Sequence, residues 1–195
     1  MFRFLSDNTD TVGSRTPQGP ISGNSYLRDH GIRDVSGQAE NLESPMDYDA
    51  VFSVVKRSVR KVTGRERAGL GLALSRLPPT LGAFWQVGGN YIVINEALVD
   101  EMAKIASSPL EFNSFVYMIL THEYLHSVGY IDEREARIMT EKVSRSTFGN
   151  DHPATVMSSR DLWQMYPQLL SVHGGTGSSI RIISKFDSDS LSYFA

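Results

Sequence analysis

Apolar residues recur at helical spacing over residues 46–63, the first strongly patterned part of the chain. They fall three or four positions apart, which places them on one face of an α-helix. The set comprises Met46, Ala50, Val51, Val54, Val55, Val59 and Val62. Gly64 follows as a stop signal, and several basic residues near the end suit the dipole of a helix C-terminus. The pattern predicts an amphipathic helix whose basic residues form a solvated face.

The next runs have the features of β-strands. Leu70, Leu72 and Leu74 alternate with other residues, which predicts a half-buried strand. After the break at Pro78–Pro79, the runs LGAFWQV and NYIVIN are rich in aromatic and β-branched residues and are joined through Gly88–Gly89. We predict that these two runs pair as a hairpin and that a helix follows over EALVDEMAKIASS.

The clearest helix start of the chain is at Ser108. This residue is a suitable N-cap, Pro109 fits the first helical position, and Glu111 completes a capping box. A strongly apolar run continues from there to Gly129, where the helix is expected to stop. A further helix is predicted over residues 132–146. Helix, strands and then helices predict an α+β fold, in which a small twisted mixed sheet is backed by the apolar helix and flanked by the others.

The two ends of the chain differ from its middle. Residues 6–45, which make up most of the segment 1–45, are rich in Ser, Asp, Asn, Gly and Pro, so they bury too little to offset the entropy of ordering them. We predict a flexible N-terminal arm, with a segment that covers a cleft as the alternative. Residues 46–170 have the size of one domain. Residues 171–195 predict a Gly/Ser loop, one short strand in IRIISKF and a polar tail.

Composition narrows the possible chemistry. The 195 residues are 41% apolar and carry a formal net charge of −3, which gives no overall attraction to nucleic acid or to an anionic membrane. The chain has no cysteine, so any metal would be held by His, Asp or Glu, and disulfides and thiol nucleophiles are excluded. No apolar run has the length of a signal peptide or of a membrane span, which favours a cytoplasmic location.

The segment THEYLHSVGYIDEREAR, residues 121–137, contains the candidate chemistry. His122 and His126 are four positions apart on one helix face, so both imidazoles can bind one zinc ion. Glu123 directly follows the first histidine and can accept a proton from a water that the ion acidifies. This arrangement is the HExxH zincin motif. The structural alternative is a pair of hydrogen-bonded histidines on a buried helix face.

A catalytic zinc site needs a third protein ligand, and the motif extends as H-E-x-x-H-x-x-G-x-x-D through Gly129 and Asp132. The glycine can end the helix in a left-handed conformation and turn the chain back toward the metal. The extended motif resembles that of the metzincin zinc endopeptidases. The resemblance implies a zincin-like fold with Glu123 as general base. The zinc ligands that it implies are His122, His126 and Asp132.

The resemblance to metzincins also implies a methionine in a tight turn beneath the metal. HPATVMSS looks like this turn, with Met157 as its methionine. Some metzincins have a tyrosine two residues later, where this chain has Ser159. The group that stabilises the oxyanion is therefore open between the zinc, Tyr166 and a backbone amide.

The role of Asp132 has an alternative. The pattern D-x-x-E, from Asp132 to Glu135, is also a good helix start, because an aspartate at the N-cap accepts backbone N–H groups. If Asp132 is a cap, the third ligand is Glu133, Glu135 or His152. A glutamate ligand from the following helix would resemble the gluzincin pattern.

A second resemblance is to the YbeY-type endoribonucleases, whose histidine signature is matched at Leu125, Gly129 and Tyr130 and by the helix DEREARIMTE. The chain departs from it at Glu123 and Asp132, which stand where that family has a glycine and a histidine. A carboxylate beside the attacking water suits amide hydrolysis and would repel a phosphodiester. We therefore predict a zinc metalloendopeptidase that acts on a peptide or protein and has no nucleic-acid or membrane partner. A zinc-binding protein without turnover is the third possibility.

The expected substrate site is the edge of a strand near the motif helix. In zincins an extended peptide adds to such an edge as one more strand. The candidate is LGAFWQVGGNYIVIN, where Phe84, Trp85 and Tyr91 could line a cleft. Aromatic residues in a sheet more often pack in the core, and we favour that role for Phe84.

Overall fold

The structure, a computed structural model, describes residues 2–3, 42–172 and 179–189. Most of the predicted arm lies outside the described residues, as do the Gly/Ser loop at 173–178 and the end of the tail at 190–195. In the part that is described, six α-helices and one short 3-10 helix accompany a five-stranded sheet. The predicted α+β class is confirmed at this level.

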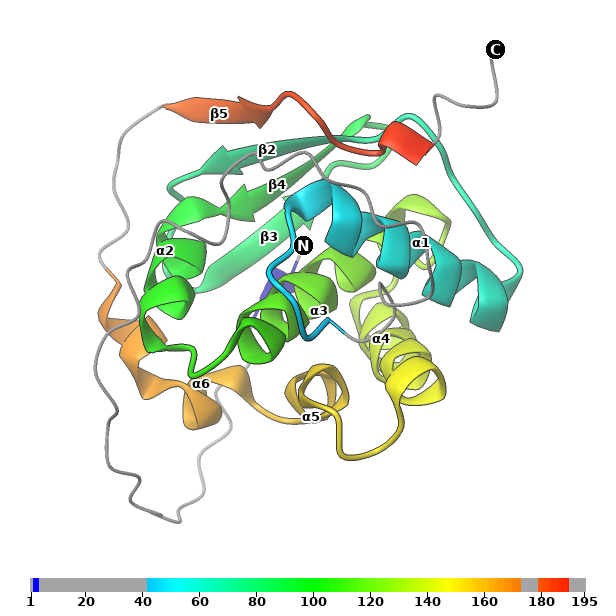
Figure 1. Ribbon diagram of the computed structural model, residues 1–195. Helices are drawn as coiled ribbons and strands as arrows, with labels where there is room; N and C mark the ends of the chain where they lie inside the picture. The colour runs from blue at the N-terminus through cyan, green and yellow to red at the C-terminus, as the bar shows by residue number, and fades with distance from the viewer. Residues whose placement is uncertain (1, 4–41, 173–178, 190–195) are drawn as a thin grey trace.

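The sheet is mixed and has the strand order β1-β3-β4-β2-β5 (Figure 1). Its strands are β1 (Phe2–Arg3), β2 (Gly71–Ser75), β3 (Leu81–Trp85), β4 (Tyr91–Asn95) and β5 (Ile180–Ile183). β3 and β4 pair antiparallel, as predicted for a hairpin, whereas β2 and β4 run parallel. β1 and β5 form the two outer edges, each antiparallel to its neighbour. The run predicted in IRIISKF is thus a strand of this sheet.

β2 is more deeply buried than its alternating pattern predicted. Leu72, Ala73 and Leu74 are all buried, so this strand is not half-buried. The reason is its place in the sheet, because β2 lies between β4 and β5 and has a strand on each side. Interior strands have continuous apolar runs rather than a clean alternation.

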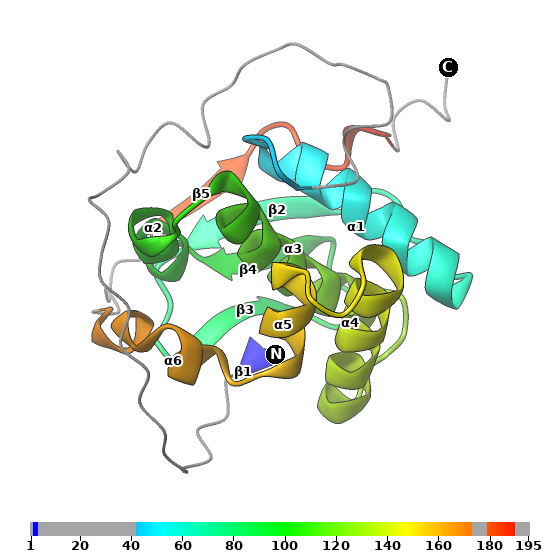
Figure 2. The same ribbon diagram turned by 60° about the horizontal axis from the view of Figure 1, so that its bottom comes forward.

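The helices form a layer against the sheet with α3 at its centre (Figure 2). Their bounds are α1 (Tyr48–Thr63), α2 (Glu96–Ile105), α3 (Pro109–Ser127), α4 (Glu133–Phe148), α5 (Pro153–Ser159) and α6 (Leu162–Met165), with the 3-10 helix η2 (Pro167–Ser171) after them. α3 contacts β3 and β4 as well as α1, α4 and α5. Every residue from Phe112 to His126 is buried, as expected of a helix that is apolar all round. Among the described helices, none has both the length and the apolar character to cross a lipid bilayer.

Local sequence accounts for the ends of these helices. The Asp47 carboxylate accepts a backbone N–H of the first turn of α1 at 2.8 Å, and Gly64 ends the helix with a φ of 71°. At the start of α3, the Ser108 hydroxyl accepts the Glu111 N–H at 3.2 Å, as predicted. The Glu111 carboxylate accepts the N–H of Ser107 at 2.7 Å, one residue before the expected partner.

Asp187 connects the segment after β5 to α1. Its Oδ1 accepts a hydrogen bond from Lys56 Nζ at 2.7 Å, and its Oδ2 accepts the backbone N–H groups of Gly69 and Leu70 at 2.7 and 3.1 Å. Only 9% of the Lys56 side chain and 1% of the Asp187 side chain are exposed. One buried carboxylate therefore holds together three parts of the chain that are distant in sequence.

Replacing Asp187 with Ala is expected to lower the free energy of unfolding by about 3–5 kcal/mol, because the Lys56 ammonium stays buried without its partner. Urea denaturation followed by circular dichroism measures the change. Glu101→Gln is the control, since the ion pair of Glu101 with Lys104 at 3.0 Å lies at the surface. That variant should lose less than about 1 kcal/mol. If both variants lose the same free energy of unfolding, the Asp187 contacts stabilise the fold no more than a surface ion pair does.

Candidate metal centre

His122 and His126 lie near the end of α3 with their rings close together. Their Nε2 atoms are 3.1 Å apart, and the ring planes are nearly perpendicular at 88°. Both residues are buried, with exposed fractions of 0% and 4%. The i, i+4 spacing thus brings two imidazole nitrogens toward one point.

Glu133, the first residue of α4, brings a carboxylate to the same point. Its Oε1 is 3.3 Å from His122 Nε2, and its Oε2 is 3.4 Å from His126 Nε2. Ligand atoms about 2.0–2.1 Å from a tetrahedral zinc ion stand roughly 3.3 Å from one another, so the observed spacings match those of a zinc site. Among the described residues, His122, His126 and Glu133 form the group whose ligand atoms lie close enough to hold a metal ion. The Glu133 side chain is 39% exposed, so the group reaches the surface on this side.

Asp132 occupies a different position from the one that the metzincin resemblance predicted. Its Oδ1 accepts the N–H of Glu135 at 2.9 Å, so Asp132 is the N-cap of α4. Gly129 turns the chain with a φ of 105°, as expected. An N-cap side chain must fold over the first N–H groups of its own helix, and the next residue, Glu133, therefore reaches the histidines. The structure therefore brings Glu133, and not Asp132, close to the two histidines.

The other two alternatives for the third ligand lie elsewhere. Glu135 is exposed in the first turn of α4 and is not part of the group of ligand atoms. His152 caps α5, with its Nδ1 accepting the N–H of Ala154 at 3.1 Å. Its ring stacks on Phe148 at a centroid distance of 4.3 Å. Of the candidates that the sequence left open, Glu133 is the one that the fold brings to the histidines.

Hydrogen bonds at the far side of each imidazole orient the rings. His126 Nδ1 is 2.7 Å from the carbonyl oxygen of Tyr130, which can only accept, so Nδ1 carries the proton. His122 Nδ1 lies 3.5 Å from the Thr140 hydroxyl, which itself donates to the Ala136 carbonyl at 2.8 Å. In this arrangement both Nε2 lone pairs point to the metal position. Partners of this kind commonly fix the tautomer of metal-binding histidines.

The charges of the group also suit a cation. Burial lowers the pKa of His122 to about 4, although the nearby Glu133 carboxylate acts in the opposite direction. Partial burial raises the pKa of Glu133, but the two imidazoles, whose Nε2 atoms lie 3.3 and 3.4 Å from its oxygens, outweigh it and leave that pKa well below its usual range. At neutral pH His122 is therefore uncharged and Glu133 ionised, which are the forms that bind metal ions.

Glu123 is fully buried beside this group. In the part of the chain that the structure describes, neither of its carboxylate oxygens has a hydrogen-bond partner. Burial raises the pKa of Glu123 to about 7, while the charge of His126 and the backbone of Trp85 at the end of β3 act in the opposite direction. Burying a carboxylate is costly, and groups whose pKa is shifted by burial are concentrated at functional sites.

Two further expectations require correction. Pro153–Ser159 is the helix α5 and not a tight turn, because His152 caps it and Pro153 occupies its first position. Met157 is buried on this helix. The Tyr166 hydroxyl donates to Glu111 Oε1 at 2.6 Å, in the first turn of α3. That turn is about 16 Å from His122 along the helix axis, at 1.5 Å per residue, so Tyr166 is not placed to stabilise an oxyanion there.

Sequence reasoning missed three groups that support the centre. Arg137 Nε is 3.2 Å from Glu133 Oε1, one helical turn further along α4. The spacing of four residues between the two was a usable signal, because opposite charges at this spacing pair on a helix. The Thr140 hydroxyl and the Tyr130 carbonyl had no such signal, since their roles depend on how α4 and the preceding turn pack against α3.

Comparisons with known proteins give no relatives for this chain. No protein-family model matches the sequence, and neither a curated protein nor a solved structure is similar to it.

Proposed function

We propose that the chain is a zinc-dependent metallopeptidase with a zincin-like catalytic domain. The proposed ligands are His122, His126 and Glu133, and the proposed general base is Glu123. The observation that carries the proposal is the approach of two imidazole Nε2 atoms and one carboxylate to within 3.1–3.4 Å, next to a buried carboxylate. Two histidines and one glutamate are a known donor set of catalytic zinc sites, in which one position stays open for water or substrate.

Each residue of the site has a part in this proposal. The chemistry that zinc supplies when bound is that of a Lewis acid, which polarises a carbonyl and acidifies water. Glu123 accepts the proton of the attacking water and returns it to the leaving amine. Burial raises the pKa of this carboxylate to about 7, which suits a group that takes up and releases a proton near neutral pH. Arg137 holds the Glu133 carboxylate in place through their contact at 3.2 Å.

The edge of β3 supports a peptide as substrate. β3 packs against α3, and the backbone of its last residue, Trp85, is near enough to influence Glu123. The outer edge of β3 pairs with β1, where Phe2 stands opposite Ala83 and Arg3 opposite Leu81. This edge therefore accepts an extended antiparallel segment, which is how a peptide substrate would add to the sheet. A substrate that uses the whole edge must displace β1.

The charge of the site favours peptide over RNA. With Glu133 as the third ligand, the site contains two carboxylates, Glu123 and Glu133, beside the reacting bond. The charge of the zinc ion offsets the bound Glu133, so the discrimination rests on Glu123, whose ionised carboxylate repels a phosphodiester more than it does an uncharged amide. A carboxylate base is also what removal of a proton from water requires during amide hydrolysis.

The proposal is tested by incubating the zinc-loaded full chain with a complex peptide mixture and, separately, with RNA of mixed sequence. Mass spectrometry of the peptides and electrophoresis of the RNA report cleavage. We expect new peptide ends that disappear with a chelator and return with added zinc, while the RNA stays intact. RNA cleavage without peptide cleavage would instead support the endoribonuclease alternative. If zinc is bound and neither substrate is cut, the chain is a zinc protein without turnover.

A further inference from the structure

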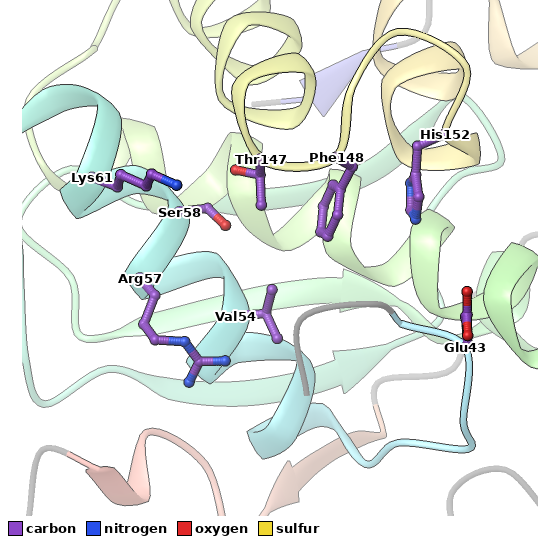
Figure 3. A pocket seen from close by; sticks show the side chains of 8 residues that line it. All are labelled: Glu43, Val54, Arg57, Ser58, Lys61, Thr147, Phe148 and His152. Carbon is purple, nitrogen blue, oxygen red and sulfur yellow. The ribbon is translucent and has the colours of Figure 1, made fainter. Parts of the chain in front are cut away.

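A second polar site lies between α1, the end of α4 and the start of α5 (Figure 3). It is a cavity of about 300 Å³ and shares no lining residue with the metal centre. This volume is at the lower end of the range for pockets that hold small organic ligands. Its lining includes the cations Arg57 and Lys61, the carboxylate of Glu43, and the rings of Phe148 and His152.

Two of the cations on α1 face this cavity without a counter-charge. Lys56 and Arg60, on the same helix, are paired with carboxylates at 2.7 and 3.4 Å. Arg57 and Lys61 line the cavity one helical turn apart, and neither has an ion-pair partner among the residues that the structure describes. Like charges at this spacing repel one another. An anion that contacts both side chains would remove this repulsion.

The cavity also has a negative end. Figure 3 shows Arg57 and Lys61 on the left and Glu43 on the right, below His152. Within the described ranges, no ion pair joins Glu43 to either cation, so these opposite charges line one cavity without coming within 4.0 Å of each other. The stacked rings of Phe148 and His152, 4.3 Å apart and inclined by 14°, provide an apolar wall.

We propose that this cavity binds a dipeptide with free termini. Its carboxylate would lie against Arg57 and Lys61, its ammonium group toward Glu43, and an apolar side chain against Phe148. A dipeptide has one acidic and one basic end, which matches the cations and the carboxylate that line this cavity without pairing. Arginine is well suited to a carboxylate because its guanidinium forms two parallel hydrogen bonds. The proposal does not depend on the metal centre.

Isothermal titration calorimetry of the full chain with glycyl-phenylalanine tests the proposal, in the presence of a chelator so that the metal centre does not contribute. Arg57→Gln and Lys61→Gln should each weaken binding by about 10- to 100-fold, since each removes a charge-assisted hydrogen bond. Arg60→Gln is the matched control, because it removes the same charge from the same helix outside the cavity. It should leave the affinity unchanged.

Blocked peptides show which end of the ligand meets which residue. N-acetylation of the dipeptide should weaken its binding to the wild type, and Glu43→Gln should weaken binding of the free dipeptide but not of the acetylated one. C-terminal amidation should likewise remove the effect of Arg57→Gln. Thermal unfolding of each variant verifies that it is folded. The proposal is overturned if the wild type does not bind the dipeptide, if inorganic phosphate binds as well as the dipeptide does, or if Arg60→Gln weakens binding as much as Arg57→Gln.

Discussion

The variant Glu123→Gln should retain zinc and lose peptide hydrolysis. Proton transfer by a positioned side chain contributes about 10²- to 10⁴-fold to a rate, so the turnover number should fall by at least that range. Zinc content should stay the same, because Glu123 is not among the atoms that surround the metal position. Steady-state kinetics on a peptide identified from the mixture, together with metal analysis of the same sample, measure both quantities.

A matched control separates loss of the base from a general effect of removing a carboxylate. Glu141→Gln makes the same change on α4, where Glu141 forms an exposed ion pair with Arg145. This variant should hydrolyse peptide at the wild-type rate. Wild-type turnover in Glu123→Gln would exclude Glu123 as the base, and a parallel loss in Glu141→Gln would mean that the assay reports stability and not chemistry.

Substitutions of the neighbouring residues Glu133 and Asp132 should have opposite effects on zinc affinity and on stability. Glu133→Ala should weaken zinc binding by more than about 100-fold, because loss of outer-shell partners alone costs about 10- to 100-fold and this variant loses a direct ligand. Asp132→Ala should keep its zinc affinity but lower the free energy of unfolding by about 1 kcal/mol, the usual cost of removing an N-cap. Competition with a zinc-binding dye and urea denaturation give the two quantities.

The comparison between these neighbours decides the third ligand. If Asp132→Ala loses zinc while Glu133→Ala keeps it, the metzincin-like ligand set is right and Glu133 is not a ligand. If both variants keep zinc at full affinity, the carboxylate does not bind the metal in solution.

The helices and strands could be predicted because their signals are local. Ser108 and Pro109 begin α3, and Gly64 ends α1, through contacts that involve only adjacent residues. Apolar spacing then assigns the buried face of each element. The depth of β2 was missed because it depends on β5, a strand more than a hundred residues away, which covers one side of it.

The part of the candidate metal centre that lies on one helix could be predicted from the sequence. His122, Glu123 and His126 share α3, so their relation follows from helix geometry. The third ligand depends on where the next helix starts, and the aspartate that fits a ligand motif is also a strong N-cap. Asp132 is the N-cap, and the carboxylate that lies beside the histidines is that of the next residue, Glu133.

The cavity between α1, α4 and α5 could not be predicted from sequence. Arg57 and Lys61 have the pattern of a solvated helix face, and nothing in that pattern indicates that Glu43 and Phe148 lie opposite them. The buried pair of Lys56 and Asp187 could not be predicted either, because its partners are 131 positions apart in the chain. Contacts of this kind arise from the packing of whole elements.

We propose above that His122, His126 and Glu133 together bind one metal ion. Anomalous diffraction at the zinc absorption edge, from crystals of the zinc-loaded full chain, tests it most directly. We expect one strong peak about 2.0–2.2 Å from the Nε2 atoms of both histidines and from a carboxylate oxygen of Glu133. A stoichiometric zinc ion found elsewhere on the chain, with no peak between these three side chains, would contradict it.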